Sequence, residues 1–267
     1  MMKNVVVEKL NVTYGDKNVL SDVSFSLEEG EFVCVLGKNG SGKSTLAKTL
    51  NALILPTSGD VSIYGMNTKD EDKSLEIRKL VGMAFQNPDN QIVASIVEED
   101  VAFGLENIGV PTEEMRVRID ESLKNLEIYD LKEEITSKIS GGQKQKVSLA
   151  GILAMKSKIM VLDEPTSMID KKGRVELLNV VKKLNKVENI TVLLISHYVE
   201  EIMYANRVLV LNDGKIAFDD TPKNILLKGD ELLNYGIELP YITNIAYELK
   251  KKGFNYKGNE TSVDELL

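Results

Sequence analysis

Short hydrophobic runs separated by turns mark the first part of the chain as rich in β-strands. Residues 5–14 and 23–27 have the composition of strands, and residues 61–64 alternate between apolar and polar side chains. Gly15-Asp16 and Glu28-Glu29-Gly30 supply turns between them. This opening predicts a β-rich layer beside a buried parallel core.

Four other runs are apolar along almost their whole length, which is typical of strands buried on both faces of a parallel sheet. The carboxyl ends of parallel strands meet at one edge, where ligands bind in open α/β folds. The runs cover residues 32–36, 81–85, 158–163 and 191–196. We therefore predict a ligand site at one sheet edge, formed by the residues that end these runs: Gly37 onward, Gln86, Asp163-Glu164 and His197.

The middle of the chain has helical rather than strand character, from about residue 92 to residue 138. A second helix is expected to begin at Ser140 and to continue through Leu153. We expect these helices to form a small subdomain, about 88–155, inserted between core strands. The helical spacing is clearest after Pro111-Thr112, in Met115, Ile119, Leu123 and Leu126.

The last part of the chain begins with a hairpin signal, Asn212-Asp213-Gly214, followed by a short helix that starts at Thr221-Pro222. A final helical stretch follows from about residue 235, and Ser262-x-x-Glu265 resembles a capping box. We expect one domain over 1–235 and a C-terminal helical extension over 236–267. One face of that extension carries Tyr241, Ile242, Ile245 and Leu249.

Composition and charge narrow the class of protein. The 267 residues are 43% hydrophobic and 28% charged, which suits a globular protein with a sizeable core. The net charge of −8 argues against a broad, non-specific nucleic-acid surface. Cys34 is the single cysteine, so no internal disulfide is possible, and its apolar strand favours a packing role.

No apolar run approaches the roughly 18 residues typical of a membrane span. The first residues lead directly into strand-like sequence without a signal-peptide pattern. We therefore expect a cytoplasmic chain that would need a partner for any work at a membrane.

A glycine-rich segment after the run 32–36 fits the phosphate-binding pattern Gly-x4-Gly-Lys-[Ser/Thr] in a strand–loop–helix setting. Glycines let backbone amides approach phosphate oxygens, and the following helix N-terminus favours an anion. Lys43 would reach the β and γ phosphates, and the Ser44 hydroxyl would take a magnesium site. The alternative is a Gly/Ser-rich turn that binds nothing. The segment is Gly37-Lys38-Asn39-Gly40-Ser41-Gly42-Lys43-Ser44-Thr45.

The other strand ends carry side chains suited to phosphate chemistry. Asp163 fits a carboxylate that holds Mg²⁺ through water, and Glu164 could polarise an attacking water. A helix cap before Pro165 is the alternative for this pair. His197, the only histidine, could donate to a γ-phosphate, although a lone histidine is more often structural. Gln86 is a plausible contact for magnesium and water, and alone it would be interpreted as a loop glutamine.

A second glycine-rich helix N-terminus, Ser140-Gly141-Gly142-Gln143, offers amides and a hydroxyl to a terminal phosphate. One phosphate loop is already present, so this motif would best serve a nucleotide held by a partner. Two copies arranged head to tail would then bury two ATP molecules. Taken alone, the motif is equally a helix-capping glycine pair.

In this order, the motifs resemble those of the ATP-binding cassette (ABC) ATPases over roughly residues 5–227. The resemblance implies an α/β fold: a P-loop NTPase core with a parallel sheet, an antiparallel β layer, an inserted helical subdomain and a helical tail. The segment 37–45 matches the Walker A motif, and residues 159–164 match the Walker B motif. Gln86 matches the glutamine of the Q-loop, and His197 matches the switch histidine. Residues 139–143 match the signature motif, and residues 167–170, which end at Asp170, match the D-loop. Tyr14 matches the aromatic residue that stacks on adenine, with a sheet-surface tyrosine as the alternative. Ile139 stands where Leu is usual, and Lys171 where many members have Pro, which leaves the D-loop geometry less defined.

A narrower resemblance is to the ATPase subunits of energy-coupling factor (ECF) transporters, on residues 85–91, 96–104 and 166–168 and, more loosely, on the tail after Leu239-Pro240. It implies ATP and Mg²⁺ as cofactors and uptake of a vitamin or a transition metal such as cobalt. It also implies three partners: a second ATPase subunit, identical or related; a transmembrane scaffold subunit that docks beside the Q-loop; and a substrate-binding membrane subunit. The chain would lie on the cytoplasmic face of the membrane, and its tail would help to pair the ATPases.

Three alternatives remain open. A soluble ABC ATPase of a cluster-assembly scaffold would have the same motifs, as would the ATPase of another ABC importer. A phosphoryl-transfer kinase would leave the motif at 140–143 without a role.

Overall fold

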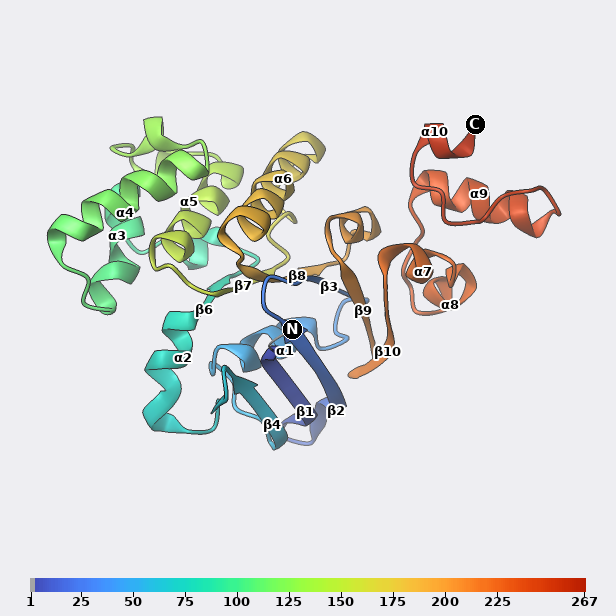
Figure 1. The fold of residues 1–267 in the computed structure, drawn as a ribbon, viewed down its shortest axis with the longest axis horizontal. Coiled ribbons are helices and arrows are strands. Elements are labelled where there is room, and N and C mark those ends of the chain that lie inside the picture. Colours follow the sequence, from blue (N-terminus) through green and yellow to red (C-terminus); the bar gives the residue numbers. More distant parts are fainter. Residues whose placement is uncertain (1–2) are drawn as a thin grey trace.

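The computed structural model describes residues 3–267 and contains two β-sheets with helices around them (Figure 1). The larger sheet has six strands in the order β10-β9-β3-β8-β7-β6, and every neighbouring pair is parallel except β10 with β9. Its strands are β3 (Phe32–Leu36), β6 (Val81–Ala84), β7 (Ile159–Asp163), β8 (Thr191–Ser196), β9 (Arg207–Asn212) and β10 (Lys215–Asp220).

The smaller sheet is antiparallel, with the order β2-β1-β4-β5. Its strands are β1 (Lys3–Tyr14), β2 (Lys17–Glu28), β4 (Ser58–Ile63) and β5 (Met66–Asn67). The second predicted strand, 23–27, is therefore longer than expected and reaches back to Lys17. This extension matters because it brings the start of β2 to the glycine-rich segment 37–45.

Both faces of the larger sheet are buried, which explains the continuous apolar runs of its strands. In β3, Val33 and Val35 belong to the core shared with the smaller sheet and helix α1 (Lys43–Leu50). Phe32, Cys34 and Leu36 point to the opposite core. That second core also receives α5 (Gly141–Ala154) and α6 (Lys171–Glu188).

The predicted helical block lies beside the sheets as a group of helices, drawn in green to yellow in Figure 1. Helix α4 follows Pro111 as predicted; Ile119 and Leu123 are buried on its inner face, and Leu126 is buried directly after its end. The elements from β6 to α5 include α3 (Val97–Asn107), α4 (Thr112–Asn125), and the short 3₁₀ turns η2 (Pro88–Asn90), η3 (Tyr129–Leu131) and η4 (Thr136–Lys138). Before β6 lie η1 (Glu71–Lys73) and α2 (Ser74–Leu80).

The C-terminal elements pack on the core near β9 and β10 (Figure 1). They are α7 (Pro222–Leu226), α8 (Gly229–Asn234), α9 (Tyr241–Lys251) and α10 (Val263–Leu266). The turn η5 (Val199–Tyr204) precedes β9 and packs against β3 and α6. The core side of α9 is formed by Thr243, Ala246 and Tyr247 rather than by its most apolar face. The predicted capping box at α10 is only half formed: Ser262 Oγ accepts from Glu265 N at 3.2 Å, while the Glu265 carboxylate accepts from Thr261 N at 2.7 Å.

Candidate nucleotide site

The segment 37–45 forms the loop between β3 and α1, as the sequence predicted. Gly40 and Gly42 have φ angles of 79° and 103°, in the left-handed region that favours glycine. At Gly42 a Cβ atom would also approach Leu20 Cδ2 at 2.7 Å and Val19 O at 2.9 Å. The glycine at this position is therefore required both by the loop conformation and by the close packing of β2.

Lys43 begins α1 and turns its side chain back into the loop. Its Nζ donates to Gly37 O at 2.8 Å and to Lys38 O at 3.2 Å. The side chain is 5% exposed, and burial lowers the pKa of its ammonium from the ordinary value, although the charge of Glu164 opposes this change. A cation is thus fixed at the helix N-terminus, where an anionic group is favoured.

Glu164 lies where three of the predicted side chains converge. Its Oε2 accepts a hydrogen bond from Gln86 Nε2 at 2.8 Å and lies 3.4 Å from His197 Nδ1. Its Oε1 lies 3.7 Å from Lys43 Nζ. The residue follows β7 directly, with a φ of 50°, and is only 8% exposed. The prediction that the ends of β3, β6, β7 and β8 meet at one sheet edge is confirmed.

Asp163 and Ser44 form an oxygen-rich pair beside this group. Ser44 Oγ donates to Asp163 Oδ1 at 3.0 Å. Burial raises the pKa of the Asp163 carboxyl from its ordinary value, and the Ser44 hydrogen bond opposes the rise. Within residues 3–267 there is no cluster of three or more His, Cys, Asp or Glu side chains that could hold a metal ion by itself. One hydroxyl and one carboxylate fit Mg²⁺, which commonly takes few protein ligands and completes its shell with phosphates and waters.

A cavity of about 470 Å³ opens over these residues. Two of its lining residues, Lys17 and Val19, come from the start of β2 and were not predicted. No local pattern marks them, because only the packing of β2 against Gly42 brings them to the loop. The remaining lining residues are Asn39, Gly40, Gly42, Lys43, Ser44, Thr45, Gln86, Glu164 and His197.

Tyr14, the predicted adenine contact, lies at the end of β1, opposite Lys17 on β2. It is 50% exposed and is not among the residues that line the cavity. Tyr14 thus pairs with a residue that lines the cavity but does not line it itself, and its contact with adenine stays a prediction.

The motif Ser140–Gln143 forms the N-terminus of α5 and lines a different cavity, of about 610 Å³, together with Asp170. Ser140 Oγ accepts from Gln143 N at 3.3 Å, and Gln143 Oε1 accepts from Ser140 N at 2.8 Å, so the two side chains form a capping box. Asp170 caps α6 through Gly173 N at 3.2 Å. The two cavities share no lining residue, so within one chain the structure does not bring this motif to the phosphate loop.

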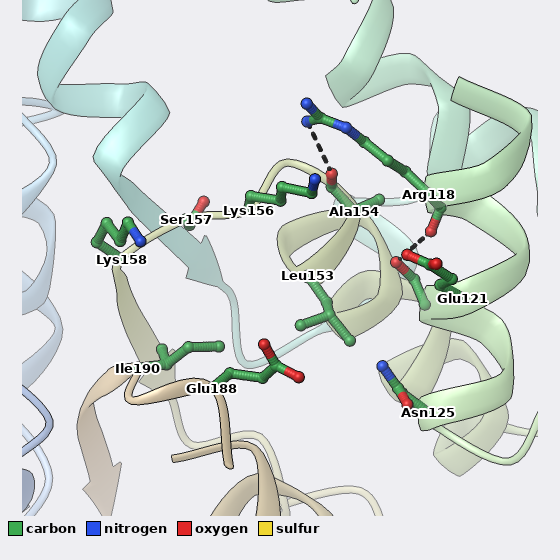
Figure 2. Close-up of a pocket in the computed structure, with 11 residues that line it drawn as sticks. Arg118, Glu121, Asn125, Leu153, Ala154, Lys156, Ser157, Lys158, Glu188 and Ile190 are labelled. Carbon is green, nitrogen blue, oxygen red and sulfur yellow. Dashed lines mark hydrogen bonds between the residues drawn. The ribbon is translucent and has the colours of Figure 1, made fainter. Parts of the chain in front are cut away.

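Another cavity, of about 200 Å³, lies between α4, the end of α5 and the end of α6 (Figure 2). Arg118, Lys156 and Glu188 are among its lining residues, and Arg118 Nη1 donates to Ala154 O at 3.4 Å. It contains none of the candidate site residues from the sequence, and its lysine, arginine and glutamate side chains are turned to different sides (Figure 2). We assign no chemistry to it.

No helix within residues 3–267 is both long enough and apolar enough to cross a membrane.

Comparison with known proteins agrees with this geometry. The ABC transporter family matches residues 20–167. The energy-coupling factor transporter ATP-binding protein EcfA1 of Caldanaerobacter subterraneus subsp. tengcongensis is 48% identical over 93% of this chain and 90% of that relative. The EcfA1 protein of Clostridium novyi is 46% identical over 99% of this chain and 95% of that relative.

Two solved structures are similar in fold as well as in sequence. CbiO1 of Clostridium perfringens, described as part of the ABC transporter complex cbiONQ, has a TM-score of 0.80 and 32% identity, and the match covers 91% of this chain and 98% of that chain. A dimeric ATP-binding cassette in a post-hydrolysis state with ADP and Pi has a TM-score of 0.74 and 30% identity, covering 82% of this chain and 98% of that chain. With its phosphate loop, its α/β fold and these relatives, the chain belongs to the ABC transporter ATP-binding proteins, among those of the energy-coupling factor type.

Proposed function

We propose that this chain is the ATP-hydrolysing motor subunit of an energy-coupling factor importer that takes up a vitamin or a transition metal. The observation that carries the chemistry is the position of Glu164, whose carboxylate contacts Lys43, Gln86 and His197 at the edge of one cavity. The named relatives support the transport role over a cluster-assembly ATPase or a kinase.

In this proposal Glu164 accepts a proton from the water that attacks the γ-phosphorus. A new P–O bond forms to that water oxygen, the bond to the bridging oxygen breaks, and ADP and phosphate result. Lys43 and the loop amides bind the phosphate oxygens, and His197 contacts the γ-phosphate. Ser44, Asp163 and Gln86 would hold Mg²⁺, which supplies charge neutralisation on the phosphates.

The separation of the two cavities supports a composite site between two ATPase subunits. In one chain, Ser140–Gln143 and Asp170 face their own cavity, which the phosphate loop does not reach. A head-to-tail pair would place the helix N-terminus of one subunit over the nucleotide of the other, where its amides favour a terminal phosphate. A relative that was solved as a dimer in a post-hydrolysis state with ADP and Pi supports the pairing of two such chains. The second subunit is a copy of this chain or a related ATPase.

The C-terminal extension, 236–267, is proposed to strengthen this pairing. Ile237, Leu239 and Tyr247 anchor it to the core, whereas Tyr241 and Phe254 are 79% and 58% exposed. Exposed aromatic side chains on an anchored segment are typical of contact surfaces.

We expect Tyr241→Glu to weaken pairing of the ATPase subunits about tenfold, because a buried aromatic at an interface contributes roughly 1–2 kcal/mol or more. Sedimentation with ATP at several protein concentrations measures the affinity between the subunits. Val117→Glu changes a residue of α4 that is 56% exposed and serves as a control with no expected effect. Pairing of Tyr241→Glu at wild-type strength would refute this role of the tail.

A groove of about 410 Å³ lies between the Q-loop, α3 and α5, and we propose that it receives the membrane scaffold subunit. Phe85, Met83, Phe103 and Val93 line it, and the last two are 48% and 59% exposed. Because the groove shares the segment after β6 with Gln86, movement there would reach the nucleotide site. The chain would then lie on the cytoplasmic face of the membrane, and a separate membrane subunit would bind the transported substrate.

This proposal is tested by Phe103→Asp. We expect at least a tenfold lower yield of the membrane scaffold when the full chain is purified from native membranes, since a charge in an apolar contact costs a few kcal/mol. ATP binding should stay at the wild-type level, because Phe103 does not line the nucleotide cavity. The control is Val187→Asp, at a residue of α6 that is 69% exposed and lies outside the groove. Full recovery of the scaffold with Phe103→Asp would contradict the assignment of the groove.

A further inference from the structure

Three side chains stack next to the nucleotide cavity: His197 and Tyr198 from the connection between β8 and η5, and Arg174 from α6. The ring centroids of His197 and Tyr198 lie 4.0 Å apart, with 40° between the ring planes. The Arg174 Cζ atom lies 4.0 Å from the centroid of the Tyr198 ring. Tyr198 therefore has the histidine ring as one neighbour and a guanidinium group as another.

The backbone fixes Tyr198 independently of its ring. Its N–H donates to Ser196 Oγ at 2.9 Å, and its carbonyl accepts from Glu201 N at 3.1 Å as η5 begins. Ser196 is itself buried at the end of β8. The main chain therefore holds the Tyr198 position, while the orientation of the rings depends on the stack.

Arg174 belongs to the first turn of α6, the helix capped by Asp170. Its N–H donates to Asp170 O at 2.9 Å, and its side chain is half-buried. A guanidinium group over an aromatic face is held by electrostatic attraction and contact area. The stack thus connects the residues around Asp170, which face the second cavity, with His197 in the first.

The orientation of the His197 ring depends on packing against a neighbouring group. Its side chain is 37% exposed, and the contact with Glu164 is 3.4 Å long. An exposed imidazole rotates about two side-chain bonds, and restricting it costs conformational entropy that packing must offset. The neighbouring Tyr198 ring, with its centroid 4.0 Å from that of the imidazole, supplies that packing.

We propose that Tyr198 and Arg174 are positioning residues that hold the His197 ring toward Glu164 and link it to the first turn of α6. This inference rests on the proposed function, in which His197 contacts the γ-phosphate. The stack thereby connects the start of α6, next to Asp170, with His197 of the same chain.

The test compares ATP hydrolysis by variants of the full chain, purified with its partners. Tyr198→Leu keeps an apolar side chain but removes the ring, and we expect kcat to fall about tenfold with less than a threefold change in KM for ATP, since the stack is worth roughly that much. Arg174→Gln should also lower kcat. Tyr198→Phe retains the ring and should restore at least half of the wild-type kcat.

The structure provides a matched control in a second pair of a cation and a ring, formed between α6 and η5. Lys182 Nζ of α6 lies 5.6 Å from the ring centroid of Tyr204 in η5, and neither residue lines the nucleotide cavity. Tyr204→Leu and Lys182→Gln should leave kcat within twofold of wild type. Thermal unfolding of each variant separates loss of fold from loss of positioning.

Combination with His197→Ala decides between positioning and general packing. If Tyr198 acts through His197, Tyr198→Leu should have no further effect on kcat in the His197→Ala background. A tenfold loss that persists in that background would overturn the inference, and so would wild-type kcat in a folded Tyr198→Leu variant. If His197→Ala alone hydrolyses ATP like wild type, the proposed role of His197 is wrong, a result distinct from failure of the stack.

Discussion

Glu164→Gln is expected to lower the rate of ATP hydrolysis by about 100-fold or more while ATP still binds. The amide has the shape of the carboxylate, so the contacts with Gln86 and Lys43 can be kept in part, but it is not a base for the attacking water. Because hydrolysis is the step that reopens the proposed pair, the variant should also accumulate as an ATP-bound dimer. Single-turnover hydrolysis and sedimentation with ATP measure the two effects.

The matched control for this variant is Glu188→Gln at the end of α6. Glu188 is an exposed glutamate, and it lines the cavity in Figure 2 rather than the nucleotide cavity. The Glu188→Gln variant should hydrolyse ATP at the wild-type rate. Hydrolysis at the wild-type rate in Glu164→Gln would refute the assignment of Glu164 as the general base. A variant that remained monomeric with saturating ATP, alone and with a related subunit, would refute the nucleotide-closed pair.

The central sheet and the phosphate loop could be predicted because their signals are local. Each buried strand has a continuous apolar run, and the glycine spacing at 37–45 fixes a loop before a helix. The meeting of Gln86, Glu164 and His197 could also be predicted, because parallel strands bring their carboxyl ends together whatever their order. The order itself was not predicted: β8 lies between β3 and β7, and β9 borders β3 on the other side.

Residues brought to the site by long-range packing could not be identified from sequence. Lys17 and Val19 reach the nucleotide cavity only because β2 is longer than its apolar run and packs against Gly42. Arg174 is more than 20 positions from Tyr198 in the sequence and meets its ring through the packing of α6 on η5.

The tail shows a second limit of pattern analysis. The apolar face of α9 was predicted from helical spacing, but spacing does not say which neighbour a face meets. The core contacts are made by Thr243, Ala246 and Tyr247, while Tyr241 remains 79% exposed. Ile242, Ile245 and Leu249 of the predicted face are only half-buried. Together with the exposed Tyr241 they leave hydrophobic surface for another chain, which is why the extension enters the proposed pairing.

Lys43→Met should lower the affinity for ATP about 100-fold, or about 2.7 kcal/mol, since in the proposed site Nζ would supply charge-assisted hydrogen bonds to phosphate. Methionine keeps the length of the chain but leaves Asp163 and Glu164 without the buried cation, so both carboxylates would repel the triphosphate. Titration calorimetry with ATP measures the loss. Lys186→Met, near the end of α6, removes an exposed lysine that does not line the cavity, and this variant should bind ATP within threefold of wild type. Equal losses in the two variants would mean that general positive charge, rather than the ammonium held inside the loop, binds the phosphates.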